Sequence, residues 1–209
     1  MFYQDQPSAT FRFGDVVQGF VSATPILNNP SQTSSTLPFS VEIQRPTFSV
    51  VLSPCCSISD KVILLTPLIP IRPAFFDNPY LAEDMTRINR VMDPEQAVPP
   101  TIWQHLSEEE KIKRKAVGRA YAFVDIFVYK ENDFFSKYVL HRKNGNIETN
   151  LQMIDFRNAY RLNCDKVVSP INSPVDTKRL ELSIEVRGEL RDKIADFYGR
   201  VPREDAVAA

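Results

Sequence analysis

The cysteines and serines of the segment 53–57 (SPCCS) are the first residues whose types could do chemistry. The segment follows the apolar run Val50–Leu52, and loops at strand ends often carry functional residues. A cysteine there is a candidate nucleophile if a neighbouring base lowers the pKa of its thiol. The only histidines, His105 and His141, are far away in sequence. The alternative interpretation is that one cysteine packs in the core and the other lies in a turn.

The same cysteines could also contribute to a zinc site. Cys55, Cys56, Cys164 and one histidine would supply four nitrogen and sulfur ligands. Adjacent cysteines, however, project in different directions and lack the usual Cys-x2-Cys spacing, and the sequence has no second close pair. We therefore predict no metal and no cofactor, and we keep a cysteine- or zinc-dependent site around Cys56 as an alternative.

A run of basic residues in the middle of the chain could bind the phosphates of a nucleic acid. The run consists of Lys111, Lys113, Arg114, Lys115 and Arg119. Three glutamates at 108–110 precede it, and acidic residues at the start of a helix with basic residues toward its end complement the helix dipole. The net charge of −1 gives no basic excess. We therefore interpret the run as a solvated helix face and keep RNA as a second candidate partner.

Asp125 stands within an otherwise apolar predicted strand, where a carboxylate must be paired or protonated. Arg119, Arg157 or Arg161 could supply the partner. The sequence fixes no second carboxylate beside it, so we predict a structural ion pair and not an acid–base pair.

Short β-strands and two or three helices must position these residues. Strand-like runs with turn residues between them occupy 11–21, 41–52, 61–68, 120–129, 138–142, 147–153 and 154–162. Residues 28–40 predict a loop, and Asn144-Gly145 predicts a hairpin turn with positive φ at both residues. Helices are predicted over 81–92, after a capping box at Ser107 and Glu110, and from the N-cap Ser183 onward. The last helix should bury Val186, Leu190, Ile194 and Phe197.

Composition limits the class of protein. The chain has 209 residues, 43% of them hydrophobic and 24% charged, which is typical of a globular protein. Sixteen prolines against six glycines favour short, interrupted elements. Three cysteines fit a reducing compartment, and the sequence shows neither a signal peptide nor a long apolar run. We expect a cytoplasmic protein without a membrane segment.

Two segments carry a resemblance to known families. Gly14–Val17, followed after a loop by Val50–Ser53 and an apolar strand, resembles an uncharacterised bacterial and phage family. Its members often read Gly-Asp-Ile-Leu and then Val-Val-Leu-Ser-Gln-Ser-Cys-Asp, so that Cys56 aligns with the family cysteine and Ser57 replaces the acidic residue. Members also share residues of the last helix: Leu182-Ser183, Arg187, Leu190 and Phe197-Tyr198-Gly199-Arg200.

The same N-terminal pattern is similar to ribonuclease toxins of the PemK/MazF type, which have an SH3-like barrel. Those toxins carry Gly-Asp and then Arg-Pro before a Val-rich strand that ends in Ser, as Arg45-Pro46 and Ser53 do here. The resemblance implies that Arg45 would hold RNA and assist cleavage. Residues 47–49 separate Arg-Pro from the Val-Val-Leu-Ser run, about two more than the toxin pattern has, which turns the arginine elsewhere unless a bulge absorbs the difference.

We therefore expect one α+β domain built on a small antiparallel SH3-like barrel or bent sheet. Residues 1–75 and 120–165 should form the β-rich core, 80–118 a helical insertion and 181–199 a C-terminal helix. The leading function hypothesis is a non-catalytic interaction protein of a bacterial or phage genome, linked by the resemblance to defence or mobile elements, whose partner is another protein. The alternatives are a PemK/MazF-like endoribonuclease that uses Arg45 and Ser53, and a site around Cys56. The oligomeric state stays open.

Overall fold

The computed structural model divides the chain into two compact units. Unit 1 comprises residues 1, 3–69 and 158–182, and unit 2 comprises residues 2, 70–157 and 183–209. The structure describes residues 1–8, 10–27, 39–54, 62–75, 88–89, 91, 97–98, 105–116, 120–121, 123–142, 145–163 and 177–199. Whether the two units unfold as one cooperative domain is a separate property, so the expected single domain stays a prediction.

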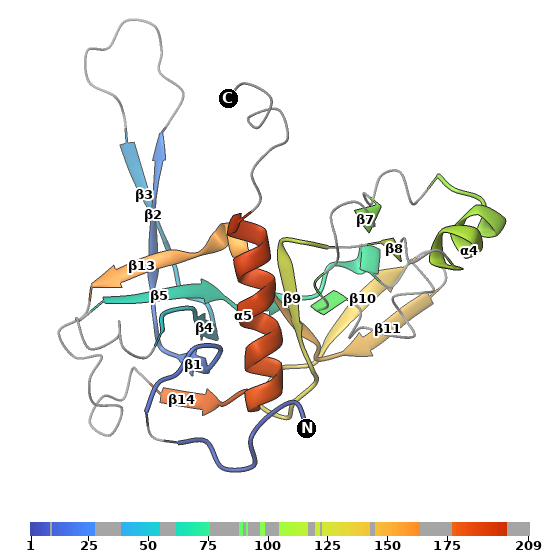
Figure 1. Ribbon diagram of the computed structural model, residues 1–209. Helices are drawn as coiled ribbons and strands as arrows, with labels where there is room; N and C mark the ends of the chain where they lie inside the picture. The colour runs from blue at the N-terminus through green and yellow to red at the C-terminus, as the bar shows by residue number, and fades with distance from the viewer. Residues whose placement is uncertain are drawn as a thin grey trace, which may run out of the picture. The chain divides into compact units, whose positions relative to one another are not determined.

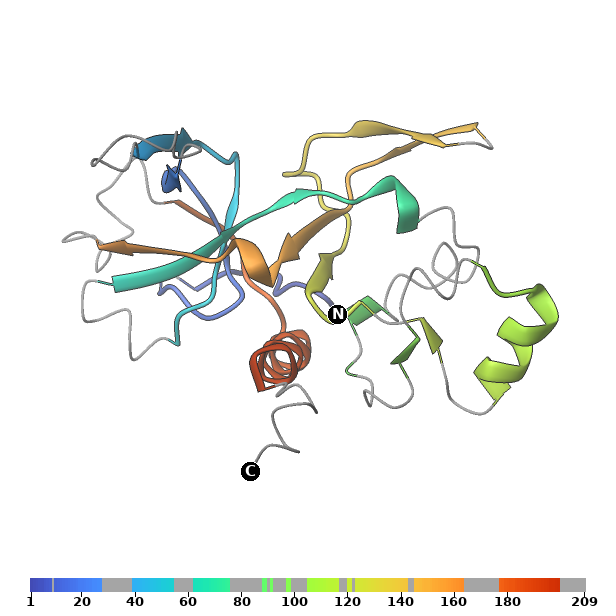
Figure 2. The ribbon, with the colours of Figure 1, turned by 90° about the horizontal axis from the view of Figure 1, so that it is seen from above.

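Unit 1 is built on a five-stranded antiparallel sheet. Its strands are β1 (Val16–Gln18), β4 (Ser49–Val51), β5 (Val62–Pro67), β13 (Tyr160–Asn163) and β14 (Thr177–Leu180). Their order is β13-β5-β4-β1-β14, so that β13 and β5 lie side by side in both views (Figures 1 and 2). The predicted antiparallel sheet is confirmed, and no closed barrel is formed by the described strands.

The core of unit 1 lies against the central strands of this sheet. It contains Phe11, Val17, Phe20, Val51, Ile63 and Leu65, with Tyr160 and Leu162 packed against it. The rings of Phe11 and Phe20 meet nearly edge to face, with centroids 6.4 Å apart. All three residues of β4 are buried, as expected for a continuous apolar run.

A separate two-stranded ribbon also belongs to unit 1. It pairs β2 (Ser22–Leu27) with β3 (Phe39–Gln44), and Figure 1 shows it extending away from β5 and β13. The strand predicted over 41–52 is therefore wrong as one element, because it divides into β3 and β4 around Arg45-Pro46. Proline removes a ladder donor and restricts the residue before it. Most of the predicted loop over 28–40 lies outside the described residues, and β3 begins at Phe39.

Unit 2 contains a second set of short strands and the described helices. Its sheet has the order β6-β12-β9, formed by Ile69–Pro70, Gln152–Asp155 and Ile126–Tyr129. β7 (Ala97–Val98) and β8 (Ala120–Tyr121) form a parallel pair. Two short 3₁₀ turns span Pro73–Phe75 and Phe156–Asn158. Asn89 supports β9, since its amide group bonds both the N–H and the C=O of Val128, at 2.7 and 2.8 Å.

The predicted hairpin is present in unit 2. β10 (Tyr138–Arg142) pairs with β11 (Gly145–Thr149), and Arg142 lies opposite Gly145. Gly145 has φ +114°, which confirms the positive φ expected there, whereas Asn144 lies outside the described residues. The single strands expected over 147–153 and 154–162 are wrong, because Asn150-Leu151 separates β11 from β12 and a 3₁₀ turn separates β12 from β13.

Both described helices begin at the predicted serines. α4 (Glu108–Ala116) follows Ser107, whose Oγ accepts the N–H of Glu110 at 3.2 Å. α5 (Ile184–Gly199) follows Ser183, whose Oγ accepts the N–H of Val186 at 3.3 Å. The helix predicted over 81–92 falls almost entirely outside the described residues.

The buried face of α5 differs from the predicted one. Val186 and Leu190 are buried as expected, but Ile194 and Phe197 are only half-buried. Lys193, which was not among the residues predicted to be buried, is buried. An α-helix has 3.6 residues per turn, so Lys193 and Ile194, three and four positions after Leu190, both lie close to the face of α5 that carries Leu190. Of these two residues, Lys193 takes the buried position.

Candidate functional site

The two residues proposed for RNA cleavage follow different strands, since Arg45 comes directly after β3 and Ser53 comes after β4. Ser53 is buried, and its Oγ accepts the N–H of Leu64 at 2.7 Å. Arg45 is exposed. The hydroxyl of Ser53 is thus engaged in joining β4 to β5, and an enzymatic role for the pair stays a prediction.

Cys55, Cys56 and Cys164 lie outside the described residues, so the nucleophile and zinc hypotheses stay predictions. Both histidines are exposed, and a ring nitrogen of His141 lies 3.1 Å from Oδ1 of Asn146. Within the described ranges, no group of three or more His, Cys, Asp or Glu residues is arranged to hold a metal ion.

Two residues of the basic run pair with glutamates of the same helix, α4. Nζ of Lys111 lies 2.7 Å from Glu108, and Nε of Arg114 lies 3.1 Å from Glu110. These pairs at i,i+3 and i,i+4 support an exposed helix face. Lys113 is exposed, and the side chains of Lys115 and Arg119 lie outside the described part of the chain.

Asp125 belongs to an arginine–carboxylate cluster in unit 2. Arg157 lies 3.0 Å from Asp125 and 2.6 Å from the buried Asp155, which Arg72 contacts at 2.7 Å. Burial raises the pKa of Asp155, but the hydrogen bonds and charges of Arg157 and Arg72 outweigh it and hold that pKa below its usual range. The predicted ion pair of Asp125 is confirmed, and Arg157 is the one of the three candidate arginines that the structure shows in contact with it. Asp125 precedes β9, so its predicted place within a strand is wrong.

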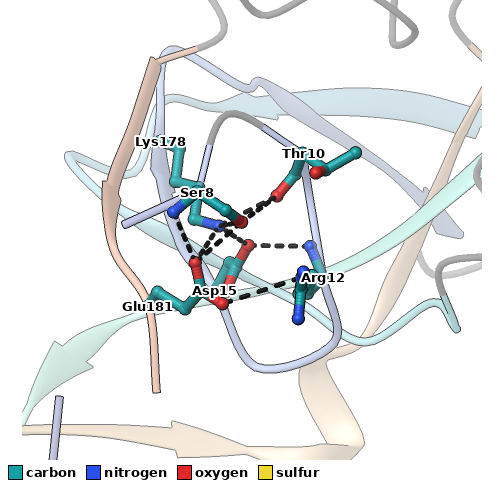
Figure 3. Close-up of polar contacts among 6 residues, drawn as sticks. All are labelled: Ser8, Thr10, Arg12, Asp15, Lys178 and Glu181. Carbon is teal, nitrogen blue, oxygen red and sulfur yellow. Dashed lines mark hydrogen bonds and ion pairs between the residues drawn. The ribbon is translucent and has the colours of Figure 1, made fainter. Parts of the chain in front are cut away.

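A buried charged cluster in unit 1 joins the carboxylate of Asp15 and the carboxylate of Glu181 to one lysine, Lys178 (Figure 3). Nζ of Lys178 lies 2.7 Å from Oδ2 of Asp15 and 2.7 Å from Oε2 of Glu181. All three side chains are at most 5% exposed. We call these three residues the Lys178 cluster.

Backbone and hydroxyl groups of the N-terminal segment complete the Lys178 cluster (Figure 3). The ammonium of Lys178 also donates to the carbonyl of Thr10 at 2.9 Å. Ser8 donates its N–H and its hydroxyl to Glu181, at 2.7 and 2.9 Å. The N–H of Arg12 donates to Asp15 at 2.7 Å, and the half-exposed guanidinium of Arg12 lies 3.7 Å from Glu181. The cluster therefore connects Ser8, Thr10, Arg12 and Asp15 to Lys178 of β14 and to Glu181, which directly follows that strand.

Local backbone geometry places these charges. Gly14 has φ +85°, which turns the chain just before Asp15, and the backbone of Asp15 accepts the N–H of Val51 at 3.0 Å. A bulge in the β1–β14 pairing leaves Arg179 without an opposite residue on β1, and Arg179 bonds the side chain of Gln18 instead.

The electrostatics of the Lys178 cluster follow from one cation serving two carboxylates. Burial raises the pKa of Asp15 to about 6, and the charge of Glu181 adds to this rise. The hydrogen bond and charge of Lys178, together with the N–H of Arg12, oppose it. An ammonium that donates to carboxylates has no free electron pair for attack, and enclosed side chains do not meet a substrate. The arrangement thus suits a structural cross-link between distant segments.

Sequence reasoning missed this cluster. It used Gly14-Asp15 only as part of a family motif, and it proposed no strand at β14. The one available signal was the alternation of charged and apolar residues in 179–182 (RLEL), which fits a half-buried strand.

The β2–β3 ribbon exposes an apolar face. In its register Ala23 lies opposite Ile43, and Pro25 lies opposite Val41, so these four residues share one side. All four are exposed, Val41 by 64% and Ile43 by 63%. The other side carries mainly polar residues: Ser22, Thr24, Ile26, Ser40, Glu42 and Gln44. We call the side with Val41 and Ile43 the ribbon face.

Unit 2 contains a polar cavity of about 350 Å³. Its lining consists of Glu131, Asn132, Asp133, Lys137, Glu148, Thr149 and Asn150. Two of its carboxylates already have partners, since Glu131 accepts the hydroxyl of Thr149 at 2.9 Å and Glu148 lies 3.5 Å from Lys137. Both contacts join residues of the cavity wall to one another.

The described helices include none with the length and apolar character needed to span a lipid bilayer. Together the sheets, the C-terminal helix and the enclosed charges define an α+β protein with several antiparallel sheets. Comparison of the chain with protein-family models, curated protein sequences and solved structures finds no match.

Proposed function

We propose that this chain is a non-catalytic interaction protein and that the ribbon face is its protein-binding surface. The observation that carries the proposal is the exposure of Val41 and Ile43 on a two-stranded ribbon. An isolated ribbon of this size is marginally stable in water, and a partner that covers one face stabilises it. Burial of a Val or Ile side chain contributes about 1.5–3 kcal/mol.

The chemistry of the ribbon selects the kind of partner. Residues 22–27 and 39–44 include one charged residue, Glu42, which lies on the side opposite to the ribbon face. A surface without Lys or Arg does not neutralise phosphates, so RNA is disfavoured as its ligand. The partner that fits is a protein with an uncharged apolar surface.

The enclosed charges support the non-catalytic part of the proposal. The Lys178 cluster is shielded from solvent, Arg157 is committed to two carboxylates, and the hydroxyl of Ser53 is bonded to Leu64. Each of these groups stabilises a junction between chain segments.

The biological context rests on the resemblance alone. We infer that unit 1 is an SH3-like sheet related to the bacterial and phage family and to the PemK/MazF type, acting in the cytoplasm in defence or on mobile elements. Support comes from the Gly14-Asp15 turn that leads into β1 and from the buried strand β4 that leads to Ser53.

Two matched variants of the ribbon test the proposal. Val41→Lys places a charge on the ribbon face, whereas Thr24→Lys places the same charge on the opposite side, across from Glu42. Purified wild-type protein and both variants are used to capture partners from a lysate of the source organism, and the captured protein is purified and titrated against each. We expect Val41→Lys to weaken binding at least tenfold, by about 1.4 kcal/mol or more, and Thr24→Lys to bind as wild type does. Equal binding by both variants would exclude the ribbon face.

A further inference from the structure

The Lys178 cluster holds an amine and two carboxyl groups in contact inside unit 1. Nζ of Lys178 lies 2.7 Å from Oδ2 of Asp15 and 2.7 Å from Oε2 of Glu181, and the three side chains are at most 5% exposed. We propose that Lys178 and Asp15 join in an intramolecular isopeptide bond, with Glu181 as the base that carries the proton. The ion-paired cluster in Figure 3 is the state before this reaction.

Contact distance and enclosure favour this bond. Since a C=O bond is about 1.23 Å long, Nζ of Lys178 lies no more than about 4 Å from Cγ of Asp15, close to the roughly 3–3.5 Å of reacting atoms. Well-oriented groups react as if each were present at about 10⁵–10⁸ M, which offsets the preference of amines and carboxylates in water for separate ions. The exclusion of water then protects the amide from hydrolysis.

The surroundings of the two carboxyl groups assign their roles. Glu181 accepts the N–H and the hydroxyl of Ser8, at 2.7 and 2.9 Å, and hydrogen bonds of this kind favour the ionised form. Burial instead raises the pKa of Asp15 to about 6, so Asp15 takes up a proton more readily than an ordinary aspartate. Glu181 is therefore the base, and Asp15 supplies the carboxyl carbon that is attacked.

The reaction conserves atoms and charge. An ammonium has no electron pair for attack, so Lys178 first passes one proton to Asp15, which leaves a neutral amine and a neutral carboxylic acid. The amine attacks Cγ of Asp15 and forms the C–N bond. Glu181 takes a second proton from the nitrogen and passes it to the departing hydroxyl group, the C–O bond breaks, and water leaves. One ammonium and one carboxylate become one amide and one water, and Glu181 ends as a carboxylate.

Mass spectrometry of the intact, denatured chain tests the bond. We expect the wild type to be lighter than its sequence by one water, and its proteolytic digest to contain two peptides joined through Asp15 and Lys178. Lys178→Arg should have the full mass, because a guanidinium keeps its proton and supplies no nucleophile. The matched control Arg12→Met should lose the water as the wild type does, because the half-exposed guanidinium of Arg12 lies 3.7 Å from Glu181 and takes no part in the reaction.

Two further variants test the roles of the carboxyl groups. Glu181→Gln removes the base, so the fraction of joined chains after a fixed incubation should fall at least tenfold. Asp15→Asn offers an amide in place of the acid, so the same bond should release ammonia and lower the mass of that variant by one ammonia. A wild type that keeps its full mass after prolonged incubation, or that loses water without peptides joined through Asp15 and Lys178, would overturn the inference. Equal joining in Glu181→Gln and wild type would overturn the role of Glu181.

Discussion

Removal of the shared cation is the sharpest perturbation of unit 1. Lys178→Met keeps the length of the side chain but leaves Asp15 and Glu181 as two buried carboxylates without the ammonium that lies 2.7 Å from each. Loss of one partner of a buried ion pair costs about 3–5 kcal/mol. Because one lysine serves two carboxylates here, we expect a loss of about 5 kcal/mol at pH 8, close to the whole stability of many domains.

The cost of Lys178→Met should depend on pH with a defined sign. The pKa of Asp15 is about 6 in the folded protein, above its ordinary value of 3.8. The stabilisation linked to this raised pKa is complete below pH 3.8 and disappears as the pH rises to about 6. Without Lys178 the carboxylates are harder to ionise, so the variant should lose less stability at pH 5 than at pH 8.

Denaturant unfolding followed by far-UV circular dichroism at both pH values measures these differences. Arg12→Met is the matched control, because the Arg12–Glu181 contact is 3.7 Å long and half-exposed, and its loss should cost less than about 1 kcal/mol. If Lys178→Met does not fold, addition of Asp15→Asn and Glu181→Gln should restore folding, since the three groups are then neutral. A loss below about 1 kcal/mol at pH 8, or an equal loss at pH 5 and pH 8, would refute the reasoning.

Three further predictions concern the hairpin, the last helix and RNA. Gly145→Val should lower the free energy of unfolding by about 1 kcal/mol or more, because φ is +114° there, and unchanged denaturant unfolding would contradict this. Leu190→Ala should lower the free energy of unfolding by about 2–5 kcal/mol. The control Ile184→Ala should leave the melting temperature nearly unchanged, because Ile184 is 71% exposed. Equal melting temperatures of the two variants would show that Leu190 does not anchor α5. Purified protein should not cleave single-stranded RNA in a gel assay, and cleavage that Arg45→Ala abolishes would reverse the ranking of the proposed functions.

Local signals in the sequence were sufficient for the element ends. Ser107 and Ser183 cap helices because their hydroxyls reach N–H groups only three residues away. Gly145 shapes its hairpin through its own backbone freedom. Asp125 could be assigned an arginine partner because a carboxylate in an apolar run requires one, and Arg157 supplies it. In each case the physical cause lies within the motif or follows from one residue's charge.

Features that depend on distant segments could not be predicted. In the sequence, the residues of β14 form a charged segment in which no partner of Lys178 can be recognised. The partner, Asp15, contacts Lys178 only after the sheet has formed. Lys193 was not predicted to be buried, because the charge of a lysine favours water, but the packing of α5 buries it. To predict the ribbon face, one would have to know the register between β2 and β3, which the sequence of residues 28–38 does not specify. Pairing and burial across long separations are tertiary properties, and no periodicity in one segment encodes them.

The contacts between the N-terminal segment and the Lys178 cluster also have a consequence for biosynthesis. Ser8 and Glu181 are 173 residues apart, and ribosomes add about 5–20 residues per second, so roughly 10–35 seconds separate their synthesis. During that interval β1 lacks β14, and its open edge can pair with strands of other nascent chains. We expect unit 1 to complete its sheet only after residue 181 emerges, so that translation arrest before this point leaves a chain open to aggregation or proteolysis.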